Sequence, residues 1–146
     1  MAHREPIDHV GWDLHRASRA WKQDFVRRMA ERGHAWAGEA CGSLIEHIDR
    51  AGGPQATLVA RSGMSKQAVQ QHRDELERHG IVERVPDAKD ARRKLVRLTA
   101  RGREALTDVD AVKRAIEADY AAILGADGLA RLIHALRHIA GGDGDG

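Results

Sequence analysis

The chain has few of the residues and segments on which several classes of protein depend. Its 146 residues include one cysteine, Cys41, so a disulfide framework is excluded. No run of about 18 apolar residues is present to span a bilayer. The first eight residues lack the apolar segment of a secretory signal, and only 3% of all residues are aromatic. We therefore expect a cytoplasmic protein with no membrane partner.

Motifs for catalysis and for metal binding are also missing from the sequence. It contains no glycine-rich phosphate loop, no nucleophile motif and no paired zinc-ligand motif. His134 and His138 have a spacing that suits two metal ligands, but neither a cysteine nor a carboxylate pair nearby completes the set. We predict that the protein is not an enzyme and has no cofactor and no metal site.

Positive charge is concentrated in the middle of the chain. The formal net charge is only +2, yet the segment from Arg61 to Arg103 holds twelve Lys or Arg against six acidic residues. This segment therefore carries +6 and the remainder −4. A basic segment between acidic flanks indicates a surface for phosphate, although a charged solvated surface is the alternative.

Apolar residues spaced alternately by three and four predict helices near both ends of the chain. We expect a first helix that Asp8 caps, a second near residues 39–50, a third over about residues 100–124 with Thr99 as its cap, and a last helix capped by Asp127. The apolar positions of the first helix are Ile7, Val10, Leu14, Ala17, Trp21, Phe25 and Met29. Pro54 suits the first turn of a further short helix.

The resulting organisation is one compact chain with four parts. Residues 1–38 form an N-terminal dimerisation helix and loop, 39–99 a DNA-binding region and 100–140 the C-terminal dimerisation helices. Residues 141–146 form a tail of Gly and Asp that we expect to be disordered. The central region is too small to cover the apolar stripes of the terminal helices. We therefore predict two-fold pairing into a homodimer, with a monomeric helical bundle as the alternative.

The stretch from Thr57 to Leu98 is the most informative part of the sequence. A short helix is followed by Gly63, which permits a sharp turn, and by Ser65, which can cap a second helix. This order is typical of a helix-turn-helix. On a helical wheel, the inward side of the second helix has Val69, His72 and Leu76. The outward side has Gln67, Gln70, Gln71 and Asp74, with Lys66 on the flank. Glutamine and lysine at the start of a capped helix suit the major groove.

A hairpin with a basic tip follows this second helix. After Gly80, two short β-prone runs, residues 81–85 and 95–98, enclose a loop with Arg92 and Arg93. Arginines of this kind are attracted to a narrow minor groove. We interpret Asp90 as a brace that orients an arginine, because phosphate would repel its carboxylate.

These residues resemble the MarR family of bacterial regulators. The run from Leu76 to Arg84 is similar to that family's end of the recognition helix and first wing strand, and residues 87–102 are similar to its wing and following helix. The resemblance implies a homodimer on a near-palindromic operator. It also implies that a small phenolic or aromatic ligand binds between the dimer region and the DNA-binding region and weakens DNA binding. We expect DNA contacts from Ser65, Lys66, Gln67, Gln70, Gln71, Arg73, Arg92, Arg93 and Lys94.

Two further sites have competing interpretations. Trp12, His15, Arg16 and Trp36 are candidates for the wall of a pocket in which Arg16 pairs with an aromatic carboxylate. The alternative is that the tryptophans only pack in a dimer helix. Cys41 is a candidate oxidation sensor or, alternatively, a small buried packing residue.

We predict a mainly α fold with a small β-hairpin wing: a winged helix-turn-helix with N- and C-terminal dimerisation helices. The predicted function is sequence-specific binding of double-stranded DNA, as a transcriptional repressor that a small aromatic or phenolic ligand releases. The alternatives are a redox- or metal-responsive regulator of the same fold, or a winged-helix module that binds protein without specific DNA binding.

Overall fold

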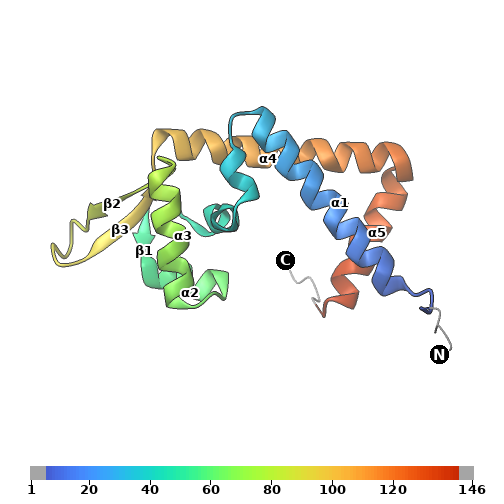
Figure 1. Cartoon of the computed structure of the whole chain (residues 1–146), viewed down its shortest axis with the longest axis horizontal. Coiled ribbons are helices and arrows are strands. Elements are labelled where there is room, and N and C mark those ends of the chain that lie inside the picture. The colour runs from blue at the N-terminus through green and yellow to red at the C-terminus, as the bar shows by residue number, and fades with distance from the viewer. Residues whose placement is uncertain (1–5, 142–146) are drawn as a thin grey trace, which may run out of the picture.

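The fold is mainly helical with one small sheet, as the computed structural model shows over residues 6–141. The elements are α1 (Val10–Glu31), η1 (Ala35–Gly38), η2 (Ala40–His47), β1 (Gly53–Pro54), α2 (Gln55–Ser62), α3 (Lys66–Arg78), β2 (Val82–Pro86), β3 (Lys94–Leu98), α4 (Ala100–Leu124) and α5 (Ala126–Ile139). In Figure 1, α2, α3 and the sheet lie at one end, α5 lies at the other, and α4 connects the two. We call residues 40–98 the winged lobe. The predicted fold class is confirmed.

The turn between α2 and α3 has the predicted local chemistry. Gly63 has a φ of 68°, a conformation that a residue with a Cβ adopts only at a cost. The Ser65 hydroxyl accepts a hydrogen bond from the Ala68 N–H at 3.1 Å and so caps α3. The turn and the cap fix where α3 begins and leave its N-terminal end at the surface.

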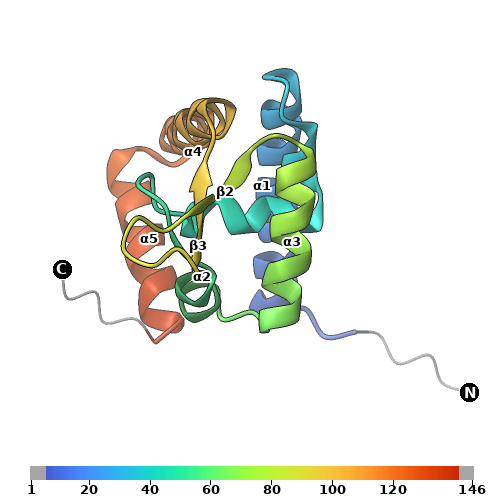
Figure 2. The same cartoon turned by 90° about the vertical axis from the view of Figure 1, so that its left-hand side faces the viewer.

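The sheet has the strand order β1-β3-β2 and is antiparallel throughout. Figure 2 shows β2 and β3 next to each other. Strands β2 and β3 form the predicted hairpin, with Arg84 opposite Val96. Strand β1 was not predicted, because glycine and proline have little tendency to form strands. It forms through tertiary pairing, with Gly53 opposite Val96 and Pro54 opposite Leu95. Pro54 therefore lies immediately before α2, at the edge of the sheet, where a missing N–H is tolerated.

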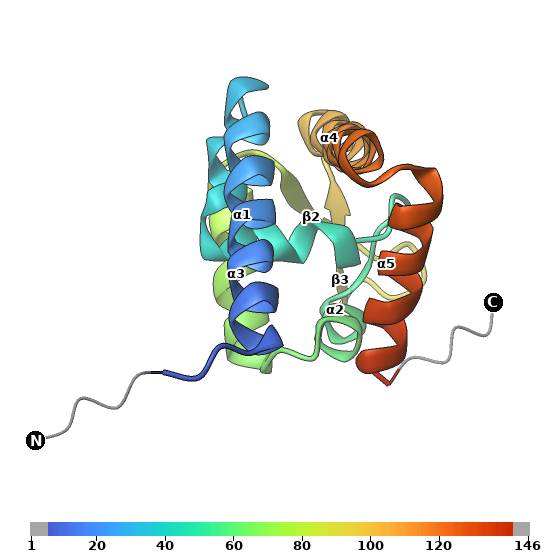
Figure 3. The same cartoon turned by 90° about the vertical axis from the view of Figure 1, so that its right-hand side faces the viewer.

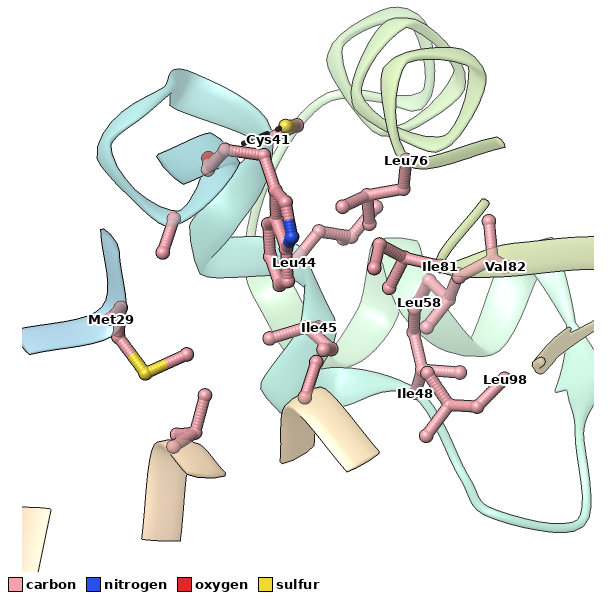
Figure 4. Packing of buried hydrophobic residues seen from close by; sticks show 14 of the residues in the cluster. Met29, Cys41, Leu44, Ile45, Ile48, Leu58, Leu76, Ile81, Val82 and Leu98 are labelled. Carbon is pink, nitrogen blue, oxygen red and sulfur yellow. Dashed lines mark hydrogen bonds between the residues drawn. The ribbon is translucent and has the colours of Figure 1, made fainter. Parts of the chain in front are cut away.

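One buried apolar cluster joins the winged lobe to α1 and α4. Figure 4 shows Met29, Leu44, Leu76 and Leu98 converging from four parts of the chain, and each is fully buried. The first half of α4 adds further buried residues, namely Ala105, Val109, Val112 and Ile116. α4 is therefore part of the same core as the winged lobe, so its position relative to α3 is fixed by packing.

Several predicted helix ends and one predicted helix need correction. His9, not Asp8, caps α1, because His9 Nδ1 accepts from the Gly11 N–H at 3.1 Å. Gly125 precedes α5 without a side-chain cap, and Asp127 lies inside the first turn. The helix expected at residues 39–50 is the shorter 3₁₀ helix η2, although Leu44, Ile45 and Ile48 are buried as predicted. Over two turns an apolar pattern does not distinguish 3.0 from 3.6 residues per turn.

The predictions for α4 were more accurate. It spans Ala100–Leu124 as expected, and the Thr99 hydroxyl caps it by accepting from the Gly102 N–H at 3.0 Å. Of the tail expected to be disordered, residues 142–146 lie outside the described residues.

We call α5, the N-terminal part of α1 and the C-terminal end of α4 the helical arm. Its large apolar side chains are not covered by any described residue. α5 has no buried residue, and α1 and α5 lie apart from one another (Figure 3). The exposed apolar residues are Ile7, Val10, Trp12, Leu14, Ile123, Leu124, Leu132, Leu136 and Ile139. Within residues 6–141, no helix has both the length and the apolar composition needed to cross a membrane.

Candidate nucleic-acid interface

The outward face of α3 is polar and open to solvent. Gln67, Gln70 and Gln71 are exposed, whereas Val69 and Leu76 on the opposite face are fully buried. None of the three glutamines makes a side-chain hydrogen bond to another described residue. Their amides, which both donate and accept, are therefore available to a ligand. His72 is half-buried rather than fully inward, with 17% of its side chain exposed.

Arg73 does not belong to this face, which corrects the prediction that it contacts DNA. It is 8% exposed, and its guanidinium donates to Gln55 of α2 and to Asp74 at 2.7 Å. Three helical positions after Gln70 the chain has turned about 300° around the axis, toward α2. Arg73 therefore holds α3 against α2, and it also forms an ion pair with the Asp74 carboxylate.

The tip of the hairpin has four exposed cations: the predicted contacts Arg92, Arg93 and Lys94, together with Lys89. None of them has an ion-pair partner among residues 6–141. The Asp90 carboxylate accepts from the backbone N–H of Arg92 at 3.0 Å, and the Asp90 carbonyl accepts from the Arg93 N–H at 3.0 Å. Asp90 therefore does brace the tip, but through the backbone rather than through a guanidinium.

Other arginines of the hairpin are paired with acids of the winged lobe. Arg84 Nε lies 2.8 Å from Glu77 Oε1, and Arg97 Nε lies 2.7 Å from Glu83 Oε1. These pairs connect β2 to α3 and β2 to β3. The free positive charge of the hairpin is therefore concentrated at its tip, on the part that extends farthest from the core (Figure 1).

The comparison with known proteins agrees with the winged helix-turn-helix geometry described above. Residues 41–93, which include η2, α2, α3 and the hairpin tip, match the model of the MarR family. The chain is therefore similar to the MarR family over this segment. The resemblance inferred from the sequence is thereby confirmed. No curated protein sequence matches the chain.

Solved structures with a MarR-type fold extend the likeness to most of the chain. A probable transcriptional regulator from Pseudomonas aeruginosa is 23% identical, with a TM-score of 0.69 over 90% of this chain and 97% of that one. The repressor CouR, solved with a 23-mer DNA duplex, is 24% identical, with a TM-score of 0.69 over 90% and 92%. MarR from E. coli in its apo form is 21% identical, with a TM-score of 0.66 over 92% and 98%. At these identities the likeness establishes the fold.

The predicted ligand residues do not come together. Trp12 is 51% exposed, and Arg16 NH2 lies 3.7 Å from Asp13 Oδ1 on the same helix. His15 is exposed. Trp36 is buried in η1, near the opposite end of α1. The sequence pattern showed only that all four are near the N-terminus, and a 22-residue helix separates its two ends by about 33 Å.

A pocket is present at Trp36 with other partners. It has a volume of about 140 Å³, and its lining includes Trp21, Phe25, Trp36, Lys22 and Lys113. Trp21 and Phe25 stack with ring centroids 5.3 Å apart, and Lys113 Nζ lies 6.0 Å from the Phe25 centroid. Lys113 is paired with Glu46, which also lines the pocket, so the aromatic floor and Lys22 are the features that suit an aromatic anion. A signal for this site was available, because Trp21 and Phe25 share one face of α1 at a spacing of four.

Cys41 is in an environment that keeps its thiol protonated. Its side chain is fully buried, and burial followed by the charges of Glu75 and Glu39 raises its pKa to about 12. The thiolate is the form that reacts with oxidants. The interpretation as a small buried residue therefore accounts for the packing of Cys41 better than the interpretation as a redox sensor.

Proposed function

We propose that the protein binds specific sequences of double-stranded DNA as a homodimer and acts as a transcriptional regulator. The observation that supports this most is the combination of three glutamines on the outward face of a capped α3 with four exposed cations at the hairpin tip. None of these side chains is paired with another described residue. Both surfaces are held by the core that also holds α4. A surface that bound DNA without sequence preference would not need α3 and the hairpin tip to be held at fixed positions relative to each other.

In the proposed complex, α3 lies in the major groove and the hairpin tip reaches the adjacent minor groove. Gln67, Gln70 and Gln71 read base edges, for which adenine is the usual bidentate partner of glutamine. Lys66 and Ser65 contact phosphate at the N-terminal end of α3, where the helix dipole favours an anion. Arg92, Arg93 and Lys94 contribute positive charge in and beside the minor groove.

Pairing of two chains through the helical arm would bring a second α3 to the DNA. Its exposed apolar side chains, among them Leu132, Leu136 and Ile139, lie 38%, 41% and 69% exposed in the single chain. Exposed apolar area of this kind on adjacent helices favours association. A two-fold dimer then presents two α3 helices to half-sites about one helical turn of DNA apart, which matches a near-palindromic operator.

Selection of bound duplexes from a random pool tests this function. The expected product is an inverted repeat with half-sites separated by about 10 to 10.5 base pairs or a multiple. The Gln67→Ala variant should select a changed base at one position of each half-site, while Glu117→Gln on α4 should select the same repeat as the wild type. A pool with no enriched sequence would contradict specific binding and favour a module that binds protein.

We further propose that the regulator is a repressor and that a one-ring aromatic acid releases it from DNA. The pocket at Trp36 has roughly the volume that holds one benzene ring. Lys22 at its mouth is exposed and has no ion pair with a described residue, so it can pair with a carboxylate. The pocket joins α1, η2 and α4, which links the arm to the winged lobe.

Two measurements together test the ligand proposal: quenching of tryptophan fluorescence and release of the operator DNA. A panel of one-ring aromatic acids should contain a member that both quenches the fluorescence and releases the operator. Lys22→Ala should weaken both effects, and Trp12→Phe, outside the pocket, should keep both. A panel without either effect on the wild type would overturn the ligand proposal and leave the DNA proposal standing.

A further inference from the structure

Three side chains of the types that bind transition metals converge where η2 meets the C-terminal end of α3. Glu39, Cys41 and His79 each offer one ligand atom, and these atoms all lie within 4.8 Å of one another. His79 Nε2 is 3.0 Å from Glu39 Oε2, and Cys41 Sγ is 3.9 Å from the same oxygen. The sequence separates Glu39 from His79 by 40 residues. For that reason no ligand spacing was visible in the sequence.

The separations suit a tetrahedral zinc ion. With zinc bonds of about 2.0–2.1 Å to nitrogen and oxygen and about 2.3 Å to sulfur, ligand atoms lie about 3.3–3.7 Å apart. The observed 3.0 and 3.9 Å lie on either side of that range. The ligand atoms of Cys41 and His79 lie within 4.8 Å of each other, so side-chain movements are needed to bring the three donors onto one ion. A thiolate, an imidazole and a carboxylate together are a donor set that suits zinc.

Glu75 lies beside this cluster on α3 but outside the three donors that converge, so it becomes a fourth ligand only when its side chain moves toward the ion. It precedes His79 by four residues, so the two side chains are neighbours on the helix surface. Its carboxylate also lies close enough to the Cys41 thiol to affect it. Glu75 Oε2 is 3.9 Å from His72 Nδ1, a buried atom without a hydrogen-bond partner among the described residues.

The three donors differ in how far they are exposed to solvent. Cys41 is fully buried at the boundary between η2 and α3 (Figure 4), whereas the Glu39 and His79 side chains are 52% and 35% exposed. An ion therefore reaches the thiol from solvent between Glu39 and His79. A surface Glu-His pair alone would be an ordinary weak ion pair. The thiol and the second carboxylate beneath it distinguish this cluster.

We propose that Glu39, Cys41, Glu75 and His79 form a zinc site that fastens the end of α3 to η2. The thiol proton is released to solvent when zinc binds, so that Cys41 coordinates as the thiolate. The site lies at the opposite end of α3 from Ser65 and uses none of the residues proposed to contact DNA. Its existence can therefore be tested without DNA.

The test uses the full-length chain, stripped of metal with a chelator and kept reduced. Titration with Zn²⁺ against a chromophoric chelator should show one ion per chain. Titration with Co²⁺ should produce the near-ultraviolet absorption of a thiolate-to-cobalt bond. Zn²⁺ should also raise Tm, because a ligand that binds only the folded state stabilises it.

Variants separate this site from adventitious binding. Cys41→Ser should abolish the cobalt–thiolate absorption, and His79→Gln should weaken Zn²⁺ binding by more than about 100-fold, since even outer contacts cost 10–100-fold. His79 is partly exposed, so its variant should fold even if Cys41→Ser does not. His138→Gln, from the exposed pair on α5, should behave as the wild type. The proposal is overturned if the thiolate absorption is absent, if His79→Gln binds as tightly as the wild type, or if His138→Gln loses the ion.

Discussion

The guanidinium of Arg73 in α3 donates a hydrogen bond to the side-chain oxygen of Gln55 in α2. Because Arg73 is buried, its removal leaves Gln55 without this partner. We expect Arg73→Ala to lower the free energy of unfolding by about 1–3 kcal/mol. Gln71→Ala, which removes an exposed side chain from the same helix, should change it by less than about 0.5 kcal/mol. Urea denaturation measures both, and equal effects would show that Arg73 does not hold the two helices together.

The hairpin tip should affect DNA binding without affecting folding. Arg92 is exposed and has no ion pair among the described residues, so Arg92→Ala should leave the Tm unchanged. Affinity for the selected operator should fall, and the slope of log affinity against log salt should become shallower by up to about 1. Arg114→Ala removes the same charge from the exposed side of α4 and serves as the control. Unchanged operator binding by Arg92→Ala would count against the tip as a DNA contact.

Acid should weaken the connection between α4 and the segment after α1. Hydrogen bonds from His34 and then Arg32 hold the pKa of Asp108 below its usual value of 3.8. The folded state therefore favours the ionised carboxylate, and this stabilisation is present above pH 3.8 and is lost as the pH falls through the lower folded-state pKa.

Asp108→Asn should therefore lower the free energy of unfolding at neutral pH, and its difference from the wild type should shrink as the pH falls below 3.8. Glu117→Gln neutralises an exposed carboxylate of the same helix and should show a smaller difference at neutral pH. A gap between Asp108→Asn and the wild type that stays constant down to the acid limit would disprove the linkage. Unfolding followed by circular dichroism over a pH series gives these values.

The apolar face of the helical arm should control the oligomeric state. Leu136 is 41% exposed in the single chain, and an aspartate in its place would bury a charge in the proposed dimer. Leu136→Asp should shift the mass measured by sedimentation equilibrium from dimer to monomer. Ala91→Asp, at the hairpin tip, should remain dimeric. A wild-type chain that is monomeric at micromolar concentration would refute the dimer.

Two glycines should be required for different physical reasons. A Cβ on Gly102 would lie 2.0 Å from the Ile81 carbonyl oxygen, whereas a Cβ on Gly63 would meet nothing within 4 Å. Gly63 instead has a φ of 68°, which asparagine tolerates better than alanine does.

Alanine at either position should destabilise the fold, by about 1 kcal/mol at Gly63 and about 1–3 kcal/mol at Gly102. Asparagine should recover stability relative to alanine at Gly63 only. Thermal unfolding of the four variants provides the comparison. Recovery by asparagine at Gly102 as well would show that contact with the Ile81 carbonyl is not the limiting factor there.

The sequence predicted the features that depend on local chemistry. The ends of α4, the Ser65 cap and the turn at Gly63 each follow from a few neighbouring residues. It missed features that depend on distant partners. Nothing near Gly53 indicates pairing with β3, and nothing near Arg73 shows that it packs on Gln55 rather than facing outward.

The candidate sites also divide into those set by neighbouring residues, which were predicted, and those set by distant partners, which were missed. The outward glutamines of α3 were predicted, because helical periodicity alone decides which face they share. Apart from Trp36, the residues of the pocket were not predicted, and neither was the zinc site. Trp36 approaches Lys113, and Glu39 approaches His79, only after the chain has folded. Tryptophans close together in sequence led to the wrong pocket wall at Trp12.

Specific DNA binding is tested most directly by titrating the selected operator and a scrambled duplex of the same composition with the full chain over a range of salt concentrations. The predicted result is operator binding tighter by at least about 10³, with log affinity falling linearly and steeply as log salt rises. Equal affinity for the two duplexes, with little dependence on salt, would contradict the proposed function.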